Sequence, residues 1–263
     1  MTPILFLGAG KMGSAIAFGL VKMGATRASD ILLIDPHPEP DATALARQGA
    51  ELNPRKDRLV TAKTVVLAVK PQIWREAAES IAPYLAPNAL IVSIAAGVRT
   101  ADLEAVFGPR PVARVMPTTA VAVAKGVASV YAREKAARAA AHAVFRPLAK
   151  VVDLASEDLM DASTAVSGSG PAYLYALVEA MTAAGVTAGL SEAVSSELSR
   201  ATVIGAAHLM DVTGEAAMDL RLQVTSPGGT TSAALSVLLG DPGLNELMVR
   251  AVAAAVARAK DLG

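Results

Sequence analysis

The sequence predicts an α/β fold, in which an N-terminal doubly wound parallel sheet is followed by a C-terminal all-α domain. Three observations lead to this prediction. Short apolar runs alternate with helical patterns in the first part of the chain, as in a parallel sheet that helices cover on both faces. A glycine-rich turn follows the first of these runs. From about Glu157 onward, Ala-rich stretches show apolar residues spaced three to four apart, which is typical of helices.

The elements of the N-terminal domain follow from the positions of these runs. Short runs rich in apolar and β-branched residues indicate strands at Ile4–Gly8, Ile31–Asp35, Val65–Lys70, Ala89–Ile94 and Val112–Met116. Helical patterns separate them at Met12–Met23, Gln72–Ala82 and Thr100–Phe107. Two further strand-like runs flank one more helix, at Val127–Tyr131, Val151–Leu154 and Glu134–Leu148. We therefore predict a sheet domain over residues 1–155.

Residues 156–263 are predicted to form a helical substrate and dimerisation domain. Helix-start signals stand at Ser191-Glu192, Ser226-Pro227 and Asp241-Pro242. Alanine side chains bury little area each, so such helices gain stability by close approach or by packing against another subunit. We expect this domain to join copies of the chain into a homo-oligomer. The smallest such assembly is a dimer, and a larger ring is the alternative. The alternative is a surface that is Ala-rich only because alanine favours helices.

The composition excludes several functions. Of 263 residues, 24 are Lys or Arg and 24 are Asp or Glu, so no net charge attracts nucleic acid or an anionic membrane surface. No apolar run reaches the ~18 residues that a bilayer requires. With no cysteine and only 3 histidines, the chain lacks the residues for disulfides, thiolate catalysis or a typical metal site. We expect no metal ion and a cytoplasmic protein.

The glycine-rich turn Gly8-Ala9-Gly10-Lys11-Met12-Gly13 follows a strand and opens a helix, the context that a dinucleotide-binding fingerprint requires. Gly8 permits the tight turn, Gly10 lets the backbone approach a pyrophosphate, and Gly13 allows close packing of helix on strand. A purely structural turn is the alternative. We expect a Rossmann-type sheet whose strand ends hold NADH or NADPH. The candidate coenzyme residues are Leu7, Gly8, Ala9, Gly10, Lys11, Met12, Gly13, Asp35, Ala68, Val69, Lys70, Pro71, Ala95, Ala96 and Gly97.

Asp35 bears on the choice of coenzyme. It ends the second strand about 20 residues beyond the turn, where a carboxylate accepts hydrogen bonds from the adenosine ribose and repels a 2′-phosphate. This favours NADH. The cluster Arg55-Lys56-Asp57-Arg58 points the other way, because its cations can reach the adenosine end. The sequence therefore leaves the choice between NADH and NADPH open.

In the helical domain, Ser226-Pro227-Gly228-Gly229-Thr230-Thr231 indicates a loop that enters a helix. Hydroxyl groups beside free backbone N–H groups suit a small carboxylate without needing an arginine. The alternative is an ordinary helix cap behind a flexible loop.

The reaction class follows in part from an absent residue. No lysine lies between Lys150 and Lys260, and the one histidine there, His208, falls within an apolar helical pattern. A hydroxyacid dehydrogenase of this design needs such a lysine to protonate an alkoxide. A protonated imine already carries its proton and accepts hydride directly, so the protein chiefly binds and orients it.

Four motifs beyond the glycine turn carry a resemblance to one family. They are Ala68-Val69-Lys70-Pro71, Ser93-Ile94-Ala95-Ala96-Gly97-Val98, Ser167-Gly168-Ser169-Gly170-Pro171-Ala172-Tyr173 and the Ser226–Thr231 segment. Together they resemble pyrroline-5-carboxylate reductase over nearly the whole chain. The resemblance implies reduction of 1-pyrroline-5-carboxylate to L-proline by NAD(P)H, the last step of proline biosynthesis, in a cytoplasmic homo-oligomer.

The resemblance also implies roles for single residues. Ser226, Gly229, Thr230 and Thr231 would bind the substrate carboxylate, and Thr231 would act as the catalytic residue near the ring nitrogen. Glu157 falls where the family has an acidic substrate-site residue, although a Glu at a helix start is also an ordinary dipole partner.

Some positions depart from the family pattern. Thr118 and Ala120 stand where an asparagine and a proline are usual, Glu215-Ala216-Ala217 lacks a His-Pro pair, and Arg221-Leu222-Gln223-Val224 lacks an Asp. These changes affect the placement of the substrate. Two rival functions stay open: reduction of another cyclic imine or a keto acid, and a non-catalytic dinucleotide sensor.

Overall fold

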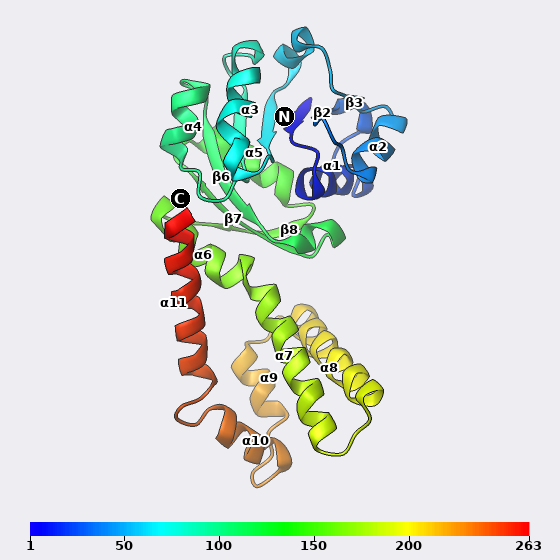
Figure 1. Cartoon of the computed structure of the whole chain (residues 1–263), viewed down its shortest axis with the longest axis vertical. Coiled ribbons are helices and arrows are strands. Elements are labelled where there is room, and N and C mark those ends of the chain that lie inside the picture. Colours follow the sequence, from blue (N-terminus) through cyan, green and yellow to red (C-terminus); the bar gives the residue numbers. More distant parts are fainter. Residues whose placement is uncertain (263) are drawn as a thin grey trace. The chain divides into compact units, whose positions relative to one another are not determined.

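The computed structural model describes residues 1–262, with side chains up to residue 260 (Figure 1). The chain forms two compact units. The sheet unit comprises Met1–Gly168 and the residues from Val256 on, and the helical unit comprises Ser169–Ala255. The predicted domain boundary between residues 155 and 156 stays a prediction.

The sheet unit contains one eight-stranded sheet in the order β3-β2-β1-β4-β5-β6-β7-β8. Its strands are β1 (Ile4–Leu7), β2 (Ile31–Ile34), β3 (Glu51–Leu52), β4 (Thr64–Leu67), β5 (Leu90–Ser93), β6 (Val112–Pro117), β7 (Gly126–Ala132) and β8 (Ala149–Asp153). The first six are parallel to one another, and the order reverses between β1 and β4. This doubly wound arrangement confirms the predicted fold class.

Six α-helices belong to this unit: α1 (Lys11–Lys22), α2 (Pro40–Arg47), α3 (Trp74–Ile81), α4 (Thr100–Phe107), α5 (Lys135–Phe145) and α6 (Met160–Ser163). Side chains that alternate along each strand enter two apolar clusters. Phe6 packs into the cluster with α1, α2 and α5, and Leu5 packs into the cluster with α3 and α4. The strands β1, β2, β4, β5 and β6 are buried on both faces along most of their length, which explains their continuous apolar runs.

Two elements of the sheet unit were not predicted. The strand β3 has only two residues, too few for a pattern. The helix α2 begins at Pro40, the third of three closely spaced prolines that obscure its start, although a proline is favourable in the first turn of a helix. The strand β7 also runs antiparallel to β6, because the short segment after Thr118 turns the chain back on itself.

The helical unit is built from α7 (Gly170–Thr187), α8 (Glu192–Thr213), α9 (Ala217–Gln223), α10 (Thr230–Leu238) and the part of α11 (Leu244–Leu262) that ends at Ala255. The helices α7 and α8 form an antiparallel hairpin (Figure 1). Ser195 is buried in it and donates a hydrogen bond to the Thr182 carbonyl at 2.7 Å. A Cβ at Gly185 would meet the Ser195 hydroxyl, so the glycine permits this close approach.

The helix-start predictions have mixed outcomes. Ser191 caps α8, because its hydroxyl accepts a hydrogen bond from the Val194 N–H at 3.4 Å. The starts predicted at Ser226-Pro227 and Asp241-Pro242 are wrong, since α10 begins at Thr230 and α11 at Leu244. Glycines follow both prolines, and the chain completes a turn through them before the helix begins.

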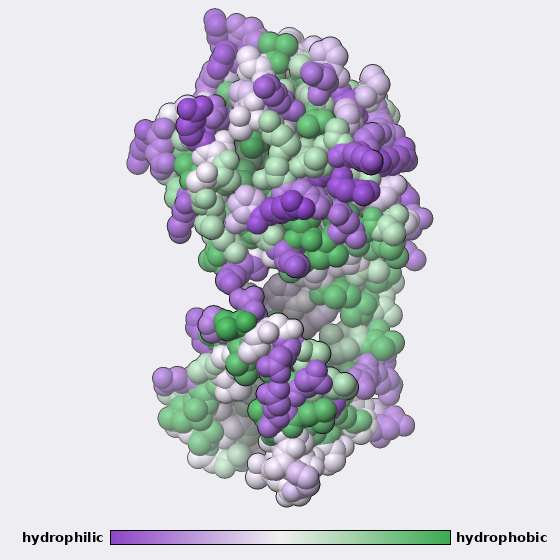
Figure 2. Space-filling model, turned by 180° about the vertical axis from the view of Figure 1, so that it is seen from behind, coloured by the Kyte–Doolittle hydropathy of each residue, from purple (hydrophilic) through white to green (hydrophobic). Residues whose placement is uncertain are grey.

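Many large apolar side chains of the helical unit are exposed in the single chain. Along α8, Val194, Leu198, Leu209 and Val212 are between 46% and 69% exposed, and their spacing places them on one stripe. Figure 2 shows hydrophobic residues on the surface of this unit. Among the described residues, no helix is long and apolar enough to span a membrane.

Candidate active site

The glycine-rich turn connects β1 to α1 at the point where the strand order reverses. Gly8 has a φ of +102°, and its N–H donates to the Ile34 carbonyl at 2.8 Å. A Cβ at Gly8 would lie 2.7 Å from the carbonyl carbon of Ala68. Only a glycine fits this position, and its closeness to Ala68 brings the ends of β1 and β4 together.

The first turn of α1 rests directly on this loop. Gly10 is the N-cap residue, and its carbonyl accepts hydrogen bonds from the Ser14 N–H at 2.9 Å and the Ser14 hydroxyl at 2.8 Å. A Cβ at Gly13 would collide with the Gly8 carbonyl oxygen. The leading N–H groups of α1 have no intrahelical partner and can bind a pyrophosphate. The glycine turn, which has no Cβ atoms at Gly8, Gly10 and Gly13, and the N-terminus of α1 together fit the pyrophosphate of a dinucleotide.

Asp35 follows β2 and lies against the same turn. The Ala9 N–H donates to Asp35 Oδ2 at 2.7 Å, and the His37 N–H donates to Asp35 Oδ1 at 2.8 Å. Asn53 was missed by the sequence analysis: its side chain bonds the backbone N–H and C=O of Asp35 at 2.9 and 3.0 Å. Its φ of 49° is one that asparagine tolerates better than most residues.

The other candidate coenzyme residues lie at neighbouring strand ends. Ala68–Pro71 follow β4 and Ala95–Gly97 follow β5, so both segments share the carboxyl edge of the sheet with the glycine turn. Lys11, Lys70 and Ala96 are exposed there. The structure thus brings the predicted coenzyme segments to one edge, where open α/β sheets bind ligands. Their contacts with a coenzyme stay a prediction.

Glu157 is buried beside the start of α4. Its carboxylate accepts hydrogen bonds from the Thr100 N–H and hydroxyl, both at 2.8 Å, and pairs with Arg114 at 3.3 Å. Burial raises the pKa of Glu157, but the Thr100 hydrogen bonds and the Arg114 charge together outweigh burial and hold it below its usual value. Both oxygens therefore have protein partners, and substrate binding by Glu157 stays a prediction.

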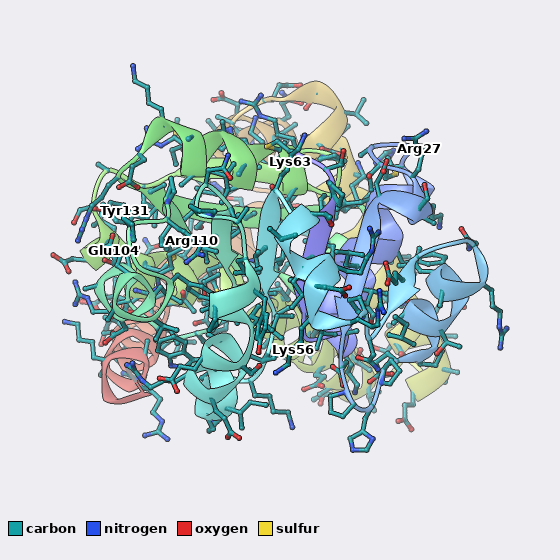
Figure 3. The ribbon with its side chains drawn as sticks, turned by 90° about the horizontal axis from the view of Figure 1, so that it is seen from above. Arg27, Lys56, Lys63, Glu104, Arg110 and Tyr131 are labelled. Carbon is teal, nitrogen blue, oxygen red and sulfur yellow. The ribbon has the colours of Figure 1, made fainter. Side chains whose placement is uncertain are left out.

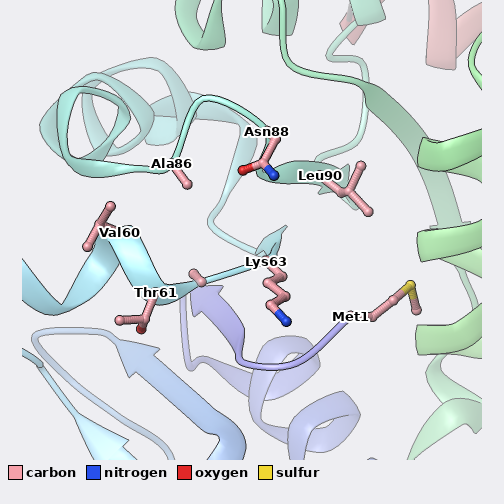
Figure 4. A pocket seen from close by; sticks show the side chains of 8 residues that line it. Met1, Val60, Thr61, Lys63, Ala86, Asn88 and Leu90 are labelled. Atoms are coloured by element: carbon pink, nitrogen blue, oxygen red, sulfur yellow. The ribbon is translucent and has the colours of Figure 1, made fainter.

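Two cavities lie in the sheet unit. One of about 380 Å³ contains Gly97, Arg99 and Glu157 in its lining. The other, of about 490 Å³, is lined by Met1, Lys63 and Leu90 among others (Figure 4). That second cavity borders the amino ends of β4 and β5 and contains none of the predicted site residues.

In the helical unit, the candidate carboxylate loop turns tightly into α10. The Gly229 N–H donates to the Ser226 carbonyl at 3.0 Å, and a Cβ at Gly229 would lie 2.5 Å from the Ser226 hydroxyl oxygen. Thr230 and Thr231 are the first residues of the helix, and Thr231 is half-buried. Hydroxyls and free N–H groups therefore gather at one helix N-terminus, as an anion site requires.

No metal site is found in residues 1–262: no group of three or more His, Asp or Glu side chains there is placed to hold an ion.

Comparisons with known proteins cover both units. Residues 157–262 match the family described as pyrroline-5-carboxylate reductase dimerisation, and residues 3–97 match the family described as NADP oxidoreductase coenzyme F420-dependent. The chain is 38% identical to the pyrroline-5-carboxylate reductase of Pseudomonas aeruginosa, over 98% of this chain and 96% of that protein.

Solved structures agree with this result. A pyrroline-5-carboxylate reductase from Coxiella burnetii has a TM-score of 0.91 at 32% identity, covering 100% of this chain and 98% of that one. The Plasmodium falciparum pyrroline carboxylate reductase, solved with NADP bound, has a TM-score of 0.82 at 26% identity, with coverages of 100% and 98%.

A doubly wound sheet with this glycine turn, followed by a helical unit, defines a nicotinamide-dependent oxidoreductase. The identity to relatives extends through both units. Within that class, the chain belongs to the pyrroline-5-carboxylate reductase family.

Proposed function

We propose that this chain reduces 1-pyrroline-5-carboxylate to L-proline with NADH or NADPH, in the last step of proline biosynthesis. Membership of the family supports the proposal. The observation that carries it is the Ser226–Thr231 turn, which presents hydroxyls and free N–H groups at the start of α10. A sheet with a dinucleotide-binding turn occurs in many dehydrogenases and does not identify the substrate. The Ser226–Thr231 turn does bear on the substrate, because its donors suit a small carboxylate.

The sheet unit has the task of holding the coenzyme. The first turn of α1 binds the pyrophosphate. Gly8 has no side chain, so the backbone of the turn comes close enough to the pyrophosphate for the N–H groups at the start of α1 to reach it. The strand ends at Ala68–Pro71 and Ala95–Gly97 complete the binding edge. When bound, the reduced nicotinamide supplies the hydride.

The helical unit has the task of orienting the substrate. Ser226, Gly229, Thr230 and Thr231 hold the carboxylate, and the Thr231 hydroxyl lies at the ring nitrogen. The nitrogen enters already protonated, so hydride addition to the imine carbon completes a neutral amine without a proton from the protein. Positioning therefore supplies most of the rate enhancement.

The test is steady-state reduction of 1-pyrroline-5-carboxylate with each coenzyme, beside a larger cyclic imine and a keto acid. We expect kcat/KM to be highest for 1-pyrroline-5-carboxylate and to fall as pH rises through the pKa of the imine itself. A higher value for another imine or for the keto acid would identify a related reductase. Coenzyme binding without any turnover would identify a sensor.

The chain forms a homo-oligomer through its helical unit, where the exposed apolar stripe of α8 packs against a second copy of the chain. We also propose the cytoplasm as its compartment, in keeping with a sequence that has no cysteine to form disulfides. Fractionation of cells that express the chain, with detection in the cytoplasmic and membrane fractions, tests this placement.

A further inference from the structure

The segment that follows β2 is tied to the glycine turn on both sides. Asp35 accepts the hydrogen bond from the Ala9 N–H at 2.7 Å, and the Glu39 N–H donates back to the Ala9 carbonyl at 3.1 Å. The Asp35 carboxylate is therefore fixed next to the turn that receives the pyrophosphate. The adenosine ribose, which adjoins that pyrophosphate, is then within hydrogen-bonding reach of the Asp35 carboxylate.

Asn53 prevents Asp35 from moving away. Its side-chain amide bonds both backbone groups of Asp35, and its own N–H donates to the Leu33 carbonyl at 2.7 Å. The His37 N–H holds the second carboxylate oxygen at 2.8 Å. Each oxygen still has a free lone pair for a ribose hydroxyl, but the carboxylate itself stays in place.

The three cations of the Arg55-Lys56-Asp57-Arg58 cluster all have other partners. Arg55 pairs with Asp57 at 2.9 Å and Arg58 pairs with Glu51 at 3.2 Å. Lys56, which Figure 3 labels, lies over the Tyr84 ring, 4.8 Å from its centre. Between residues 35 and 58, Asp and Glu outnumber Lys and Arg by five to four. His37 stands two residues from Asp35, and its side chain is exposed.

We propose that this reductase selects NADH over NADPH and that Asp35 makes the selection. The inference rests on the proposed function for its reaction, but on Asp35 and its neighbours for its selectivity. The free ribose hydroxyls of NADH donate to the fixed carboxylate, whereas a 2′-phosphate places a second negative charge against it. Because Asn53 and the turn hold Asp35, the carboxylate cannot withdraw to admit the phosphate.

The experiment measures the Kd of each coenzyme by fluorescence titration of the whole chain, without substrate. We expect NADH to bind about tenfold or more tightly than NADPH, since juxtaposed like charges cost enough for that ratio. Asp35→Asn keeps an oxygen for the Ala9 N–H and removes the charge. It should lower the selectivity at least about tenfold, with circular dichroism confirming that the variant folds.

Two matched variants sharpen the assignment. Glu39→Gln removes a carboxylate from the same segment and should leave most of the selectivity intact, whereas an effect equal to that of Asp35→Asn would show that net charge decides. His37→Gln should leave NADPH binding unchanged, and a weaker affinity would make His37 a phosphate ligand. Equal or tighter binding of NADPH by the unaltered protein would overturn the proposal.

The outcome separates this inference from the proposed function. Selective NADH binding with no reduction of 1-pyrroline-5-carboxylate would refute the function alone. Efficient reduction that runs better with NADPH would refute the selectivity alone.

Discussion

Glu157 joins three parts of the sheet unit that are far apart in the sequence. It satisfies the N-terminus of α4 through Thr100 and neutralises Arg114 in the interior of the sheet. Only 6% of the Arg114 side chain is exposed, so its buried charge relies on the pairing with Glu157. Since Thr100 follows the Ala95–Gly97 segment, the ion pair also fixes the α4 end of a predicted coenzyme loop.

Glu157→Gln should therefore destabilise the protein by about 3–5 kcal/mol at pH 7, because it leaves the Arg114 charge buried without a partner. The measurement is urea unfolding followed by circular dichroism. The control is Asp158→Asn, which breaks the exposed pair with Arg99 and should cost about 1 kcal/mol or less. Similar losses in both variants would contradict the role of burial.

The same carboxylate predicts a pH dependence. The pKa of Glu157 is lowered in the folded protein, so its stabilisation is present above the unfolded value of about 4.3 and is lost as pH falls through the lower folded value. The difference in Tm between wild type and Glu157→Gln should shrink below about pH 4. A Tm difference that stays constant down to pH 3 would show that the ionised Glu157 carboxylate is not the origin of the stabilisation.

Thr231→Ala tests the carboxylate loop at its central residue. Loss of a hydrogen bond to a charged group costs about 1.5–3 kcal/mol, so kcat/KM for 1-pyrroline-5-carboxylate should fall about 10-fold to 100-fold while the Kd for the coenzyme stays the same. Ser236→Ala is the matched control on α10, since that exposed hydroxyl donates to the Ala233 carbonyl within the same helix. Unchanged kcat/KM in Thr231→Ala would remove the loop from the substrate site.

At the level of elements, the sequence predicted most strands and their order of appearance because the central ones are short and largely buried apolar runs. It could not predict the two-residue β3 or the direction of β7, which depend on partners distant in the chain. It placed Gly8 and Asp35 in one site from spacing alone. It missed Asn53, because nothing local shows that this side chain reaches back across 18 residues to Asp35.

The α7–α8 hairpin depends on one glycine. Gly185→Ala should destabilise it by about 1–3 kcal/mol, because the new methyl group displaces the Ser195 hydroxyl and its bond to the Thr182 carbonyl. Thermal unfolding measures the loss. Adding Ser195→Ala removes the colliding oxygen, so the double variant should regain part of the stability, whereas simple additivity of the two losses would exclude a direct contact.

At the level of the whole molecule, the two units differ in how they are stabilised. The sheet unit buries its large apolar side chains in two clusters of its own, whereas α7, α9 and α10 of the helical unit contain no fully buried residue in the single chain. Gly205 lies on the same stripe of α8 as Leu198 and Leu209, and no atom stands within 4 Å of the place of its missing Cβ. This stripe accommodates a close-packed helix from a second copy.

Glutamate at both Leu198 and Leu209 should accordingly convert the oligomer to monomers, because it places charge in the interface. Size-exclusion chromatography with light scattering measures the molar mass of the assembly in solution. Val60→Glu is the control: that side chain is 55% exposed, but it belongs to the sheet unit, and the oligomer should persist. An oligomer that survives the α8 substitutions would place the interface elsewhere.

The course of the chain has one more consequence. It leaves the sheet unit after Gly168 and returns to it after Ala255, near the end of α11. The helical unit is therefore inserted into the sheet unit, not appended to it. A truncation that removes the residues from Val256 on would take away a part of the sheet unit itself and one of the two covalent links that join the helical unit to it.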